Sequence, residues 1–321
     1  MAGRLWHGST KMNENFEAFV RKNDFACWCG ERSATVFCRQ NFRRRFAALK
    51  CVACGTQRIL PKAIHDQAQA QQLYNDEQHT RAALSSEFVE GNAATILRRI
   101  DRLGIHFRPE MTVIDVGCSE GLLVETIRRK WNCRVFGVDV DERTIASART
   151  KFPEVTFLCG LAQGQMASLP KADVVIASAI LEHVTDPTQF VTGLAGLLKP
   201  GGVLFILIPN AHSLHYRIAR SWWRELLSVG EHIFLFTPGS LELLAQRCGL
   251  EVVKTITDYD RLLTPRLPGS FREAAIWIWT VTRFVVKAIC MNVPRGKSGD
   301  ILCAVLRKPA AQGQPAARRS N

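Results

Sequence analysis

The chain has 321 residues, of which 47% are hydrophobic and 22% are charged. That length and apolar content suffice for one large domain with a substantial core and a small additional segment. The formal net charge of +13 is concentrated at the two ends, because residues 1–65 carry 12 Lys or Arg against 4 Asp or Glu and residues 266–321 carry 10 against 2. Basic ends fit contact with nucleic acid, anionic lipid or a phosphorylated substrate, and they fit solvated surface charge equally well.

The amino-terminal arm, residues 1–24, argues against a secreted protein. Its sequence contains no apolar core of signal-peptide length. Eleven cysteines without a secretory signal favour reduced thiols over a disulfide framework. We therefore expect a cytoplasmic protein in which clustered cysteine pairs act as metal ligands.

The next segment is rich in cysteine and arginine and contains two cysteine pairs. Cys27 and Cys29 form a C-x-C pair, and Cys51 and Cys54 form a C-x-x-C-G knuckle. Two pairs at this separation suit a four-thiolate zinc site, because each turn places two sulfurs on one side of the metal. We predict that these four cysteines bind zinc. In one alternative Cys38 replaces a ligand, and in another the cysteines are small buried hydrophobic residues.

Three consecutive arginines, residues 43–45, lie between the cysteine pairs. They predict the basic tip of a β-hairpin, which fits nucleic acid, although Phe42 and Phe46 are the only nearby aromatic residues that could stack on bases. The cysteine-rich segment spans 25–64, and a polar, Gln-rich, helix-prone connector spans 65–108. Apolar residues at the end of this connector have helical spacing and predict a helix that leads into the main domain.

The stretch MTVIDVGCSEG, residues 111–121, organises the rest of the chain. Its apolar run predicts a buried parallel strand, and its glycines turn the chain into an apolar-periodic helix from Leu122. A strand that turns into a helix in this way brings bare backbone N–H groups up to a ligand. The next apolar strand, 134–138, leads to Asp139, whose carboxylate can accept hydrogen bonds from both hydroxyls of an adenosine ribose.

Glycine spacing separates two kinds of nucleotide cofactor. A dinucleotide site requires glycines at relative positions 0, 2 and 5, whereas Ser119 and Leu122 occupy the second and third of these positions after Gly117. The pattern Asp115-x-Gly117-x-x-x-Gly121 instead resembles the first motif of class I methyltransferases, which use S-adenosylmethionine. Ser119 departs from that family, which more often has glycine there. The resemblance implies these donor-binding residues: Asp115, Gly117, Ser119, Gly121, Asp139, Leu161 and Ser178.

Downstream elements follow the order of the same family. Residues 155–158 and 171–178 predict two further strands, and the second runs into ILEHVTDP, which resembles the branch of ubiquinone and menaquinone biosynthesis methyltransferases. A Pro-Gly-Gly turn leads to a fifth strand, 203–206, and two closing strands, 250–253 and 301–306, are expected to pair antiparallel. The sequence therefore predicts an α/β fold. We expect a Rossmann-like, seven-stranded class I methyltransferase sheet, mostly parallel with an antiparallel last strand, beside a small N-terminal cysteine-knuckle segment.

The first of two insertions in the predicted methyltransferase domain, 109–308, spans 210–237. It carries the patterns PN-x-x-S and H-x-F-x-F-T-P-x-S-L. These resemble methyltransferases of bacterial polysaccharide and lipid-linked sugar pathways, which often begin with a cysteine-knuckle domain. Because the insertion leaves the carboxyl end of a late strand, we expect it to cover the acceptor side, with Trp222, Trp223 and His232 in contact with the acceptor.

The second insertion, 258–298, contains a strongly apolar helix, 271–290, whose apolar stretch is interrupted by two cations, Arg283 and Lys287. The helix is too short and too charged for a membrane span. We favour a position over the acceptor pocket, where Trp277 would complete an apolar surface, or in a dimer interface. Peripheral contact with the inner face of the membrane is the less favoured alternative. Residues 309–321 predict a disordered tail.

His183 and His232 are the candidate catalytic residues. Methyl transfer mainly requires alignment of donor and acceptor without water, and an oxygen or nitrogen acceptor also loses a proton to a base. His183 lies just past the fourth strand, at the carboxyl edge where open α/β sheets bind ligands. His232 lies in the insertion that should cover the same edge. A purely structural role for each histidine is the alternative.

Three functions remain open from the sequence. The first is methyl transfer from S-adenosylmethionine to a small molecule, with O-methylation of a sugar, a glycolipid or polysaccharide precursor, or a quinone-like compound favoured. The second is a zinc-ribbon RNA methyltransferase, which fits the basic segment. Against it, the chain lacks the Asn/Asp-Pro-Pro-aromatic pattern of many enzymes that methylate base nitrogens. The third is a donor-binding module without catalysis, which the intact donor motif disfavours.

Overall fold

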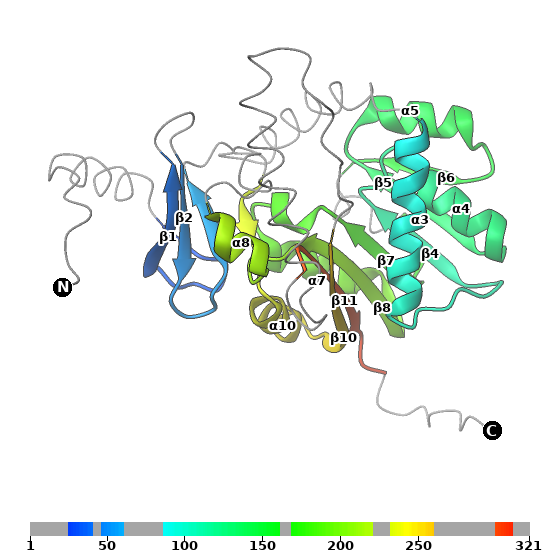
Figure 1. The fold of residues 1–321 in the computed structure, drawn as a ribbon. Helices are drawn as coiled ribbons and strands as arrows, with labels where there is room; N and C mark the ends of the chain where they lie inside the picture. Colours follow the sequence, from blue (N-terminus) through cyan, green and yellow to red (C-terminus); the bar gives the residue numbers. More distant parts are fainter. Residues whose placement is uncertain are drawn as a thin grey trace, which may run out of the picture.

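A computed structural model places the chain in two β-sheets and their covering helices (Figure 1). It describes residues 25–40, 46–60, 86–160, 168–220, 232–259 and 299–310. The following predicted features lie outside the described residues: Leu161, Trp222, Trp223, Trp277, the arginines 43–45 and the helix 271–290. Among the helices that the structure describes, none is long and apolar enough to span a membrane.

The larger sheet has seven strands in the order β10-β11-β8-β7-β4-β5-β6. They are β4 (Thr112–Val116), β5 (Arg134–Asp139), β6 (Thr156–Cys159), β7 (Ala172–Ser178), β8 (Leu198–Pro209), β10 (Glu251–Asp258) and β11 (Ile301–Arg307). The strands from β4 to β8 are parallel, and β11 runs antiparallel between β8 and β10. The predicted fold class, a mostly parallel seven-stranded sheet with an antiparallel last strand, is confirmed.

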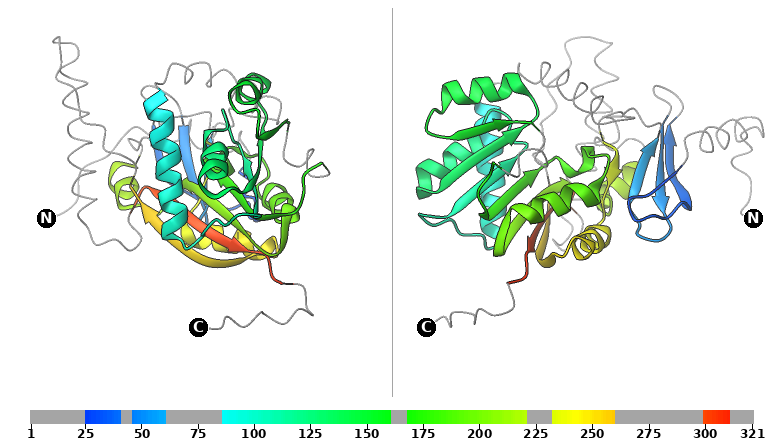
Figure 2. Two further views of the ribbon diagram at one scale, coloured as in Figure 1. Left: turned by 90° about the vertical axis from the view of Figure 1, so that its right-hand side faces the viewer. Right: turned by 180° about the vertical axis from the view of Figure 1, so that it is seen from behind.

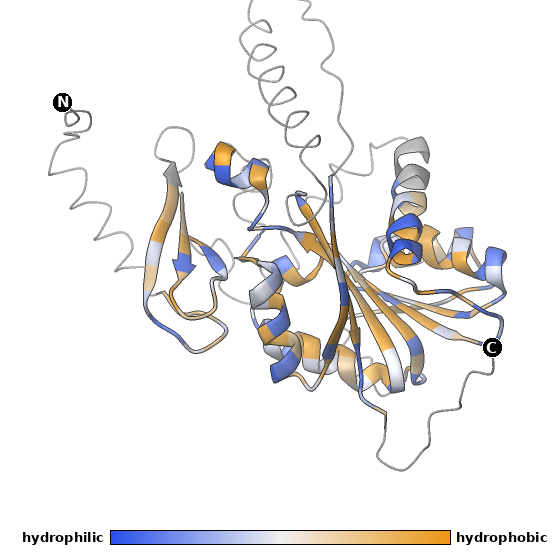
Figure 3. Cartoon of the chain, turned by 60° about the horizontal axis from the view of Figure 1, so that its bottom comes forward, coloured by the Kyte–Doolittle hydropathy of each residue, from blue (hydrophilic) through white to orange (hydrophobic). Residues whose placement is uncertain are grey.

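The central strands are apolar on both faces because helices cover both. All five residues of β4 are buried. Helices α3 (Ser86–Arg102), α4 (Leu122–Trp131) and α5 (Glu142–Lys151) pack on one face, and α7 (Pro187–Leu197) and α10 (Pro238–Arg247) pack on the other (Figure 2). Figure 3 shows apolar residues running along the sheet between the two layers. Parallel strands need such crossover helices, so a continuous apolar run is the expected pattern of a central strand.

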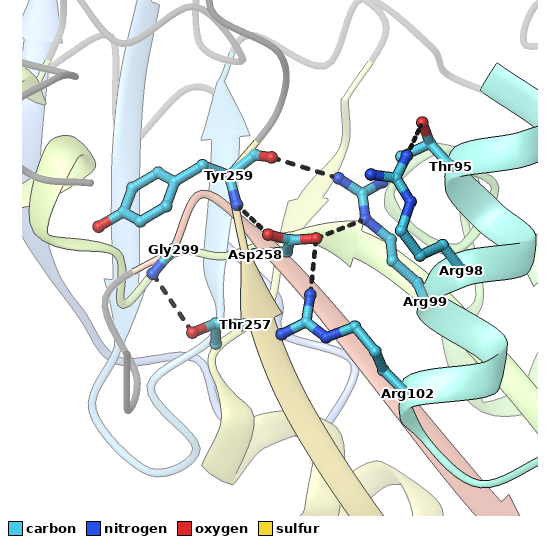
Figure 4. Close-up of polar contacts among 8 residues, drawn as sticks. All are labelled: Thr95, Arg98, Arg99, Arg102, Thr257, Asp258, Tyr259 and Gly299. Atoms are coloured by element: carbon cyan, nitrogen blue, oxygen red, sulfur yellow. Dashed lines mark hydrogen bonds and ion pairs between the residues drawn. The ribbon is translucent and has the colours of Figure 1, made fainter. Parts of the chain in front are cut away.

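A carboxylate ties helix α3 to the edge strand β10 (Figure 4). Asp258 ends β10 and accepts hydrogen bonds from Nε of Arg99 at 3.2 Å and from Nη1 of Arg102 at 3.1 Å. Arg99 is buried, and its Nη2 also donates to the carbonyl of Tyr259 at 3.5 Å. A buried guanidinium needs such a partner. Asp258 therefore fixes the helix that precedes the first strand of the domain.

Residues 25–40 and 46–60, here called the cysteine ribbon, form a second, antiparallel sheet to which the larger domain adds a strand. Its strands are β1 (Ala34–Gln40), β2 (Phe46–Cys51), β3 (Gln57–Leu60) and β9 (Phe234–Leu235), in that order. Strand β9 belongs to the insertion 210–237. It pairs with β3 through Arg58 opposite Phe234 and Gln57 opposite Leu235. Two segments that are far apart in the sequence therefore build one sheet at an end of the larger one (Figures 1 and 2).

Candidate active site

The turn after β4, residues 117–121 and here called the donor turn, is held against β5. The backbone N–H of Gly117 donates to the carbonyl of Val138 at 2.8 Å. The N–H of Ser119 donates to Oδ2 of Asp139 at 2.8 Å, and Oδ1 of the same carboxylate accepts from the N–H of Asp141 at 3.0 Å. The buried Asp139 carboxylate thus joins the turns that follow β4 and β5.

Glycines let the donor turn approach its neighbours more closely than a side chain would permit. At Gly117, where φ is +77°, a Cβ would lie 2.2 Å from Cδ1 of Ile180. At Gly121, where φ is +79°, a Cβ would lie 2.3 Å from Cζ of Phe157. Ser119 is also in the left-handed region, with φ of +48°. Glycine adopts that conformation without strain, which is the physical reason for the family's preference at this position.

Two acidic side chains are buried on neighbouring strands at this turn. Burial raises the pKa of Asp115 to about 8, and the charge of Asp139 adds to the effect. Burial also raises the pKa of Asp139, against the opposing effect of hydrogen bonds from the backbone of Asp141 and Ser119. Two carboxyl groups that are shielded from water and close together disfavour each other's ionisation. A positively charged ligand beside them would relieve that cost.

The chain leaves β7 through a turn that packs directly against the donor turn. Ser178 ends the strand, and Ala179 after it has a positive φ of +56°. A non-glycine residue in this conformation carries local strain, which is frequent at functional sites. Ile180 fills the space opposite Gly117, and the 3-10 turn η1 (Leu181–His183) follows.

The two candidate catalytic histidines lie side by side at this edge. The ring centroids of His183 and His232 are 4.8 Å apart, and their planes meet at 62°, edge to face. Oε1 of Glu182 lies 4.0 Å from Nε2 of His183. His232 and Glu182 are buried, whereas the His183 side chain is 23% exposed. A partly exposed imidazole is thus flanked by a buried imidazole and a buried carboxylate, and an imidazole can take up a proton near neutral pH.

A second buried polar pair lies at the carboxyl end of β8, and sequence reasoning missed it. Nδ1 of His215 and Oδ2 of Asp300 are 2.9 Å apart, and both side chains are buried. His215 belongs to α8 (Leu214–Ala219), and Asp300 precedes β11. Asn210 holds the two segments together, because its N–H donates to the carbonyl of Asp300 at 2.7 Å and its Nδ2 to that of Gly299 at 2.7 Å. The P-N-x-x-S pattern marks this junction in the sequence.

The four predicted zinc ligands converge in the cysteine ribbon. The sulfur atoms of Cys27, Cys29, Cys51 and Cys54 all lie within 4.8 Å of one another. Sγ of Cys27 is 3.5 Å from that of Cys54, and Sγ of Cys29 is 3.6 Å from that of Cys51. A tetrahedral zinc with Zn–S bonds of about 2.3 Å requires sulfur separations of about 3.8 Å, so the residues present fit this metal. Cys38, the alternative ligand, packs in a different apolar cluster.

Comparison with known proteins identifies the fold family. The family described as "Methyltransferase domain" matches residues 88–255, just over half of the chain. The chain belongs to this methyltransferase family. The matched range begins in α3 and ends in β10, so it contains the donor turn and both histidines, while the cysteine ribbon and β11 lie outside it.

Curated relatives agree with this assignment. A probable S-adenosylmethionine-dependent methyltransferase of Mycolicibacterium smegmatis is 32% identical over 175 residues, which cover 51% of this chain and 63% of the relative. The ubiquinone biosynthesis O-methyltransferase of Neisseria meningitidis is 29% identical over 154 residues, which cover 44% of this chain and 65% of the relative. The chain thus spans less than two thirds of the length of these relatives. The predicted likeness to ubiquinone-pathway methyltransferases is confirmed.

A solved structure supports the fold alone. One chain of the complex between the Haloferax volcanii Trm112 methyltransferase activator and a putative methyltransferase superposes with a TM-score of 0.50 and 17% identity. The match covers 71% of this chain and 100% of that one. At this identity only the architecture is shared, and the activity of the present methyltransferase must be argued from its own site.

Proposed function

We propose that this methyltransferase transfers the methyl group of S-adenosylmethionine to an oxygen of a small molecule. The acceptor class is a sugar, a glycolipid or polysaccharide precursor, or a quinone-like compound. One observation carries the proposal: Ile180 packs on Gly117 of the donor turn and leads directly to His183. A donor site and a proton acceptor are therefore adjacent at the carboxyl edge of the sheet, where open α/β sheets bind ligands.

The donor half of the site suits the chemistry of S-adenosylmethionine. Both carboxylate oxygens of Asp139 accept backbone hydrogen bonds, Oδ2 from Ser119 and Oδ1 from Asp141, and Val140 also contributes one. A carboxylate offers about four lone-pair sites, so acceptor capacity remains for a ribose hydroxyl. The sulfonium and ammonium charges of the donor would favour ionisation of the buried Asp115. Ser178 and Leu161 remain predicted donor contacts.

The acceptor half needs a base because an oxygen acceptor loses its proton. In the reaction, the acceptor oxygen bonds to the methyl carbon, the carbon–sulfur bond breaks, S-adenosylhomocysteine leaves, and the proton passes to the base. His183 is the proposed base because its imidazole is partly open while its neighbours are buried. His232, whose ring meets that of His183 edge to face, orients it. Trp222, Trp223 and Trp277 remain predicted acceptor-side residues.

Zinc in the cysteine ribbon is the second component of the proposal. The metal would cross-link two knuckles in a segment that has little apolar core of its own. Gly30 and Gly55 support the knuckles, because their N–H groups donate to the carbonyls of Cys27 and Cys51 at 3.0 and 3.1 Å. Metal analysis of the purified protein should find about one zinc per chain. A metal-free protein with a folded ribbon would refute this part.

Two binding measurements and one activity measurement test the proposed function. Calorimetry should show that the protein binds S-adenosylmethionine. Donor labelled in its methyl group should then transfer the label to a fraction of a small-molecule extract, and mass spectrometry would identify the acceptor. Label in RNA instead, with RNA binding that weakens steeply as salt rises, would favour a zinc-ribbon RNA methyltransferase. Failure to bind the donor would refute both functions.

A further inference from the structure

We infer that the cysteine ribbon positions His232 against His183, so that the integrity of a distant zinc cluster sets the geometry of the proposed base. The inference rests on the proposed function for the role of the histidines. It assigns Ile59 and Arg58, in β3 of the ribbon, as positioning residues that act through His232. The ribbon then supports one side of the proposed methyl-transfer site.

Ile233 connects the ribbon to the histidine pair. Its N–H donates to the carbonyl of Glu182 at 2.7 Å, and its carbonyl accepts from the N–H of Ile59 at 3.1 Å. The backbone of Ile233 is therefore held between η1, through its N–H, and β3, through its carbonyl. Because His232 is bonded to Ile233, a shift of β3 moves the His232 backbone relative to His183.

Side chains of the ribbon reinforce this clamp. The guanidinium of Arg58 lies over the ring of Phe234, 5.6 Å from its centroid, and Nη1 of Arg58 donates to the carbonyl of Ala26. Arg58 thus links β9 to the segment that enters the first cysteine pair. Trp28, between the two cysteines of that pair, packs against Phe236 with the ring centroids 6.4 Å apart.

The second cysteine pair leads directly into β3. Nε1 of Trp28 donates to Oγ1 of Thr56 at 2.9 Å, and Sγ of Cys54 lies 3.2 Å from the same oxygen. Strand β3 begins at the next residue, Gln57. A metal that holds the two cysteine pairs together therefore also fixes the start of β3. Loss of that metal would release β3 and, through Ile59, the backbone of Ile233 next to His232.

The donor turn takes its hydrogen bonds from a different strand, although Ile180 before η1 also packs on Gly117. Its hydrogen bonds run to Val138 and Asp139 of β5, on the opposite side of β4 from β7 and β8. Disturbance of β3 should therefore alter the histidine pair and leave donor binding in place. This separation distinguishes a positioning role from general destabilisation of the protein.

The test uses full-length, zinc-loaded protein with isotope-labelled histidine rings. Nuclear magnetic resonance should show a cross-relaxation peak between ring protons of His183 and His232, assigned with His183→Gln and His232→Gln. Ile59→Pro removes the N–H that bonds to Ile233 and leaves the β2–β3 bonds, because that N–H faces β9. Ile59→Val keeps the N–H and is the matched control. Calorimetry measures donor affinity in every sample.

We expect the peak to disappear in Ile59→Pro and in wild-type protein treated with a chelator. It should persist in Ile59→Val. Donor affinity should change by less than about twofold in all of these samples. If Ile59→Pro does not fold, Arg58→Met removes the contacts to Phe234 and Ala26 and should weaken the peak. A peak that is absent from the wild type, or that persists after chelation and in these variants while the donor still binds, would overturn the inference. A wild-type protein that binds no donor would instead refute the proposed function.

Discussion

The rings of His183 and His232 meet edge to face with their centroids 4.8 Å apart, although one follows β7 and the other precedes β9. Each histidine was a candidate from its own place in the sequence, and the structure brings the two rings together. In the proposed function this pair marks the acceptor side, because the turn that carries His183 also packs on Gly117 of the donor turn. The same junction is where β9 joins the cysteine ribbon.

His183 should be more important for turnover than for donor binding. We expect His183→Gln to lower the rate of methyl transfer by about 100-fold or more, the usual contribution of a general base, with donor affinity unchanged. His232→Gln should have a smaller effect on the rate, because it removes only a neighbour that orients the base. Single-turnover rates with labelled donor measure both. Equal rates in wild type and His183→Gln would exclude this residue as the base.

Asp139 should control donor affinity. We expect Asp139→Ala to weaken binding of S-adenosylmethionine by about 1–3 kcal/mol, because the ribose hydroxyls lose a buried acceptor and the N–H of Ser119 loses its partner. Asp139→Asn retains one acceptor oxygen and should have an intermediate effect. Calorimetry on the purified variants provides the measurement. Unchanged affinity in the alanine variant would show that the ribose is held elsewhere.

The buried Asp115 should make the donor-free fold less stable as pH rises. Its pKa is raised to about 8 in the folded protein, whereas an unfolded chain ionises aspartate near pH 3.9. Between about pH 4 and 8 the folded state therefore binds more protons than the unfolded state, and stability falls as pH increases. Asp115→Asn should lose less unfolding free energy than wild type between pH 5 and pH 8. Urea denaturation at the two pH values measures this loss of unfolding free energy. An equal loss in wild type and Asp115→Asn would contradict the interpretation.

Asp258 should stabilise the fold through its two arginines. We expect Asp258→Asn to lower the free energy of unfolding by about 1–3 kcal/mol, because the buried Arg99 loses its charged partner. The matched control is Asp101→Asn, since Oδ1 of Asp101 lies 3.5 Å from Nδ1 of His106 and both side chains are more than 70% exposed. Such surface pairs contribute little, and this variant should unfold at the wild-type urea midpoint. Equal midpoints for both variants would contradict the proposed role of Asp258 in holding α3 to β10.

The features that the sequence determined are local. The strand, glycine turn and helix around Gly117 are contiguous, so apolar periodicity and glycine spacing were enough to predict the donor turn and the parallel sheet. The cysteine pairs could be predicted as metal ligands for the same reason, because each knuckle is a short turn that presents two sulfurs together. His183 became a candidate because it directly follows a predicted strand, whose carboxyl end has a known place in such a sheet.

The features that only the tertiary structure decided are contacts between distant segments. Strand β9 has two residues, too few to show an alternating pattern, and its pairing with β3 depends on the whole domain bringing the cysteine ribbon to that edge. The His215–Asp300 pair likewise forms because β11 returns antiparallel beside β8. Burial and partner choice at these positions arise from packing across the fold, on which the local pattern of residues carries no information.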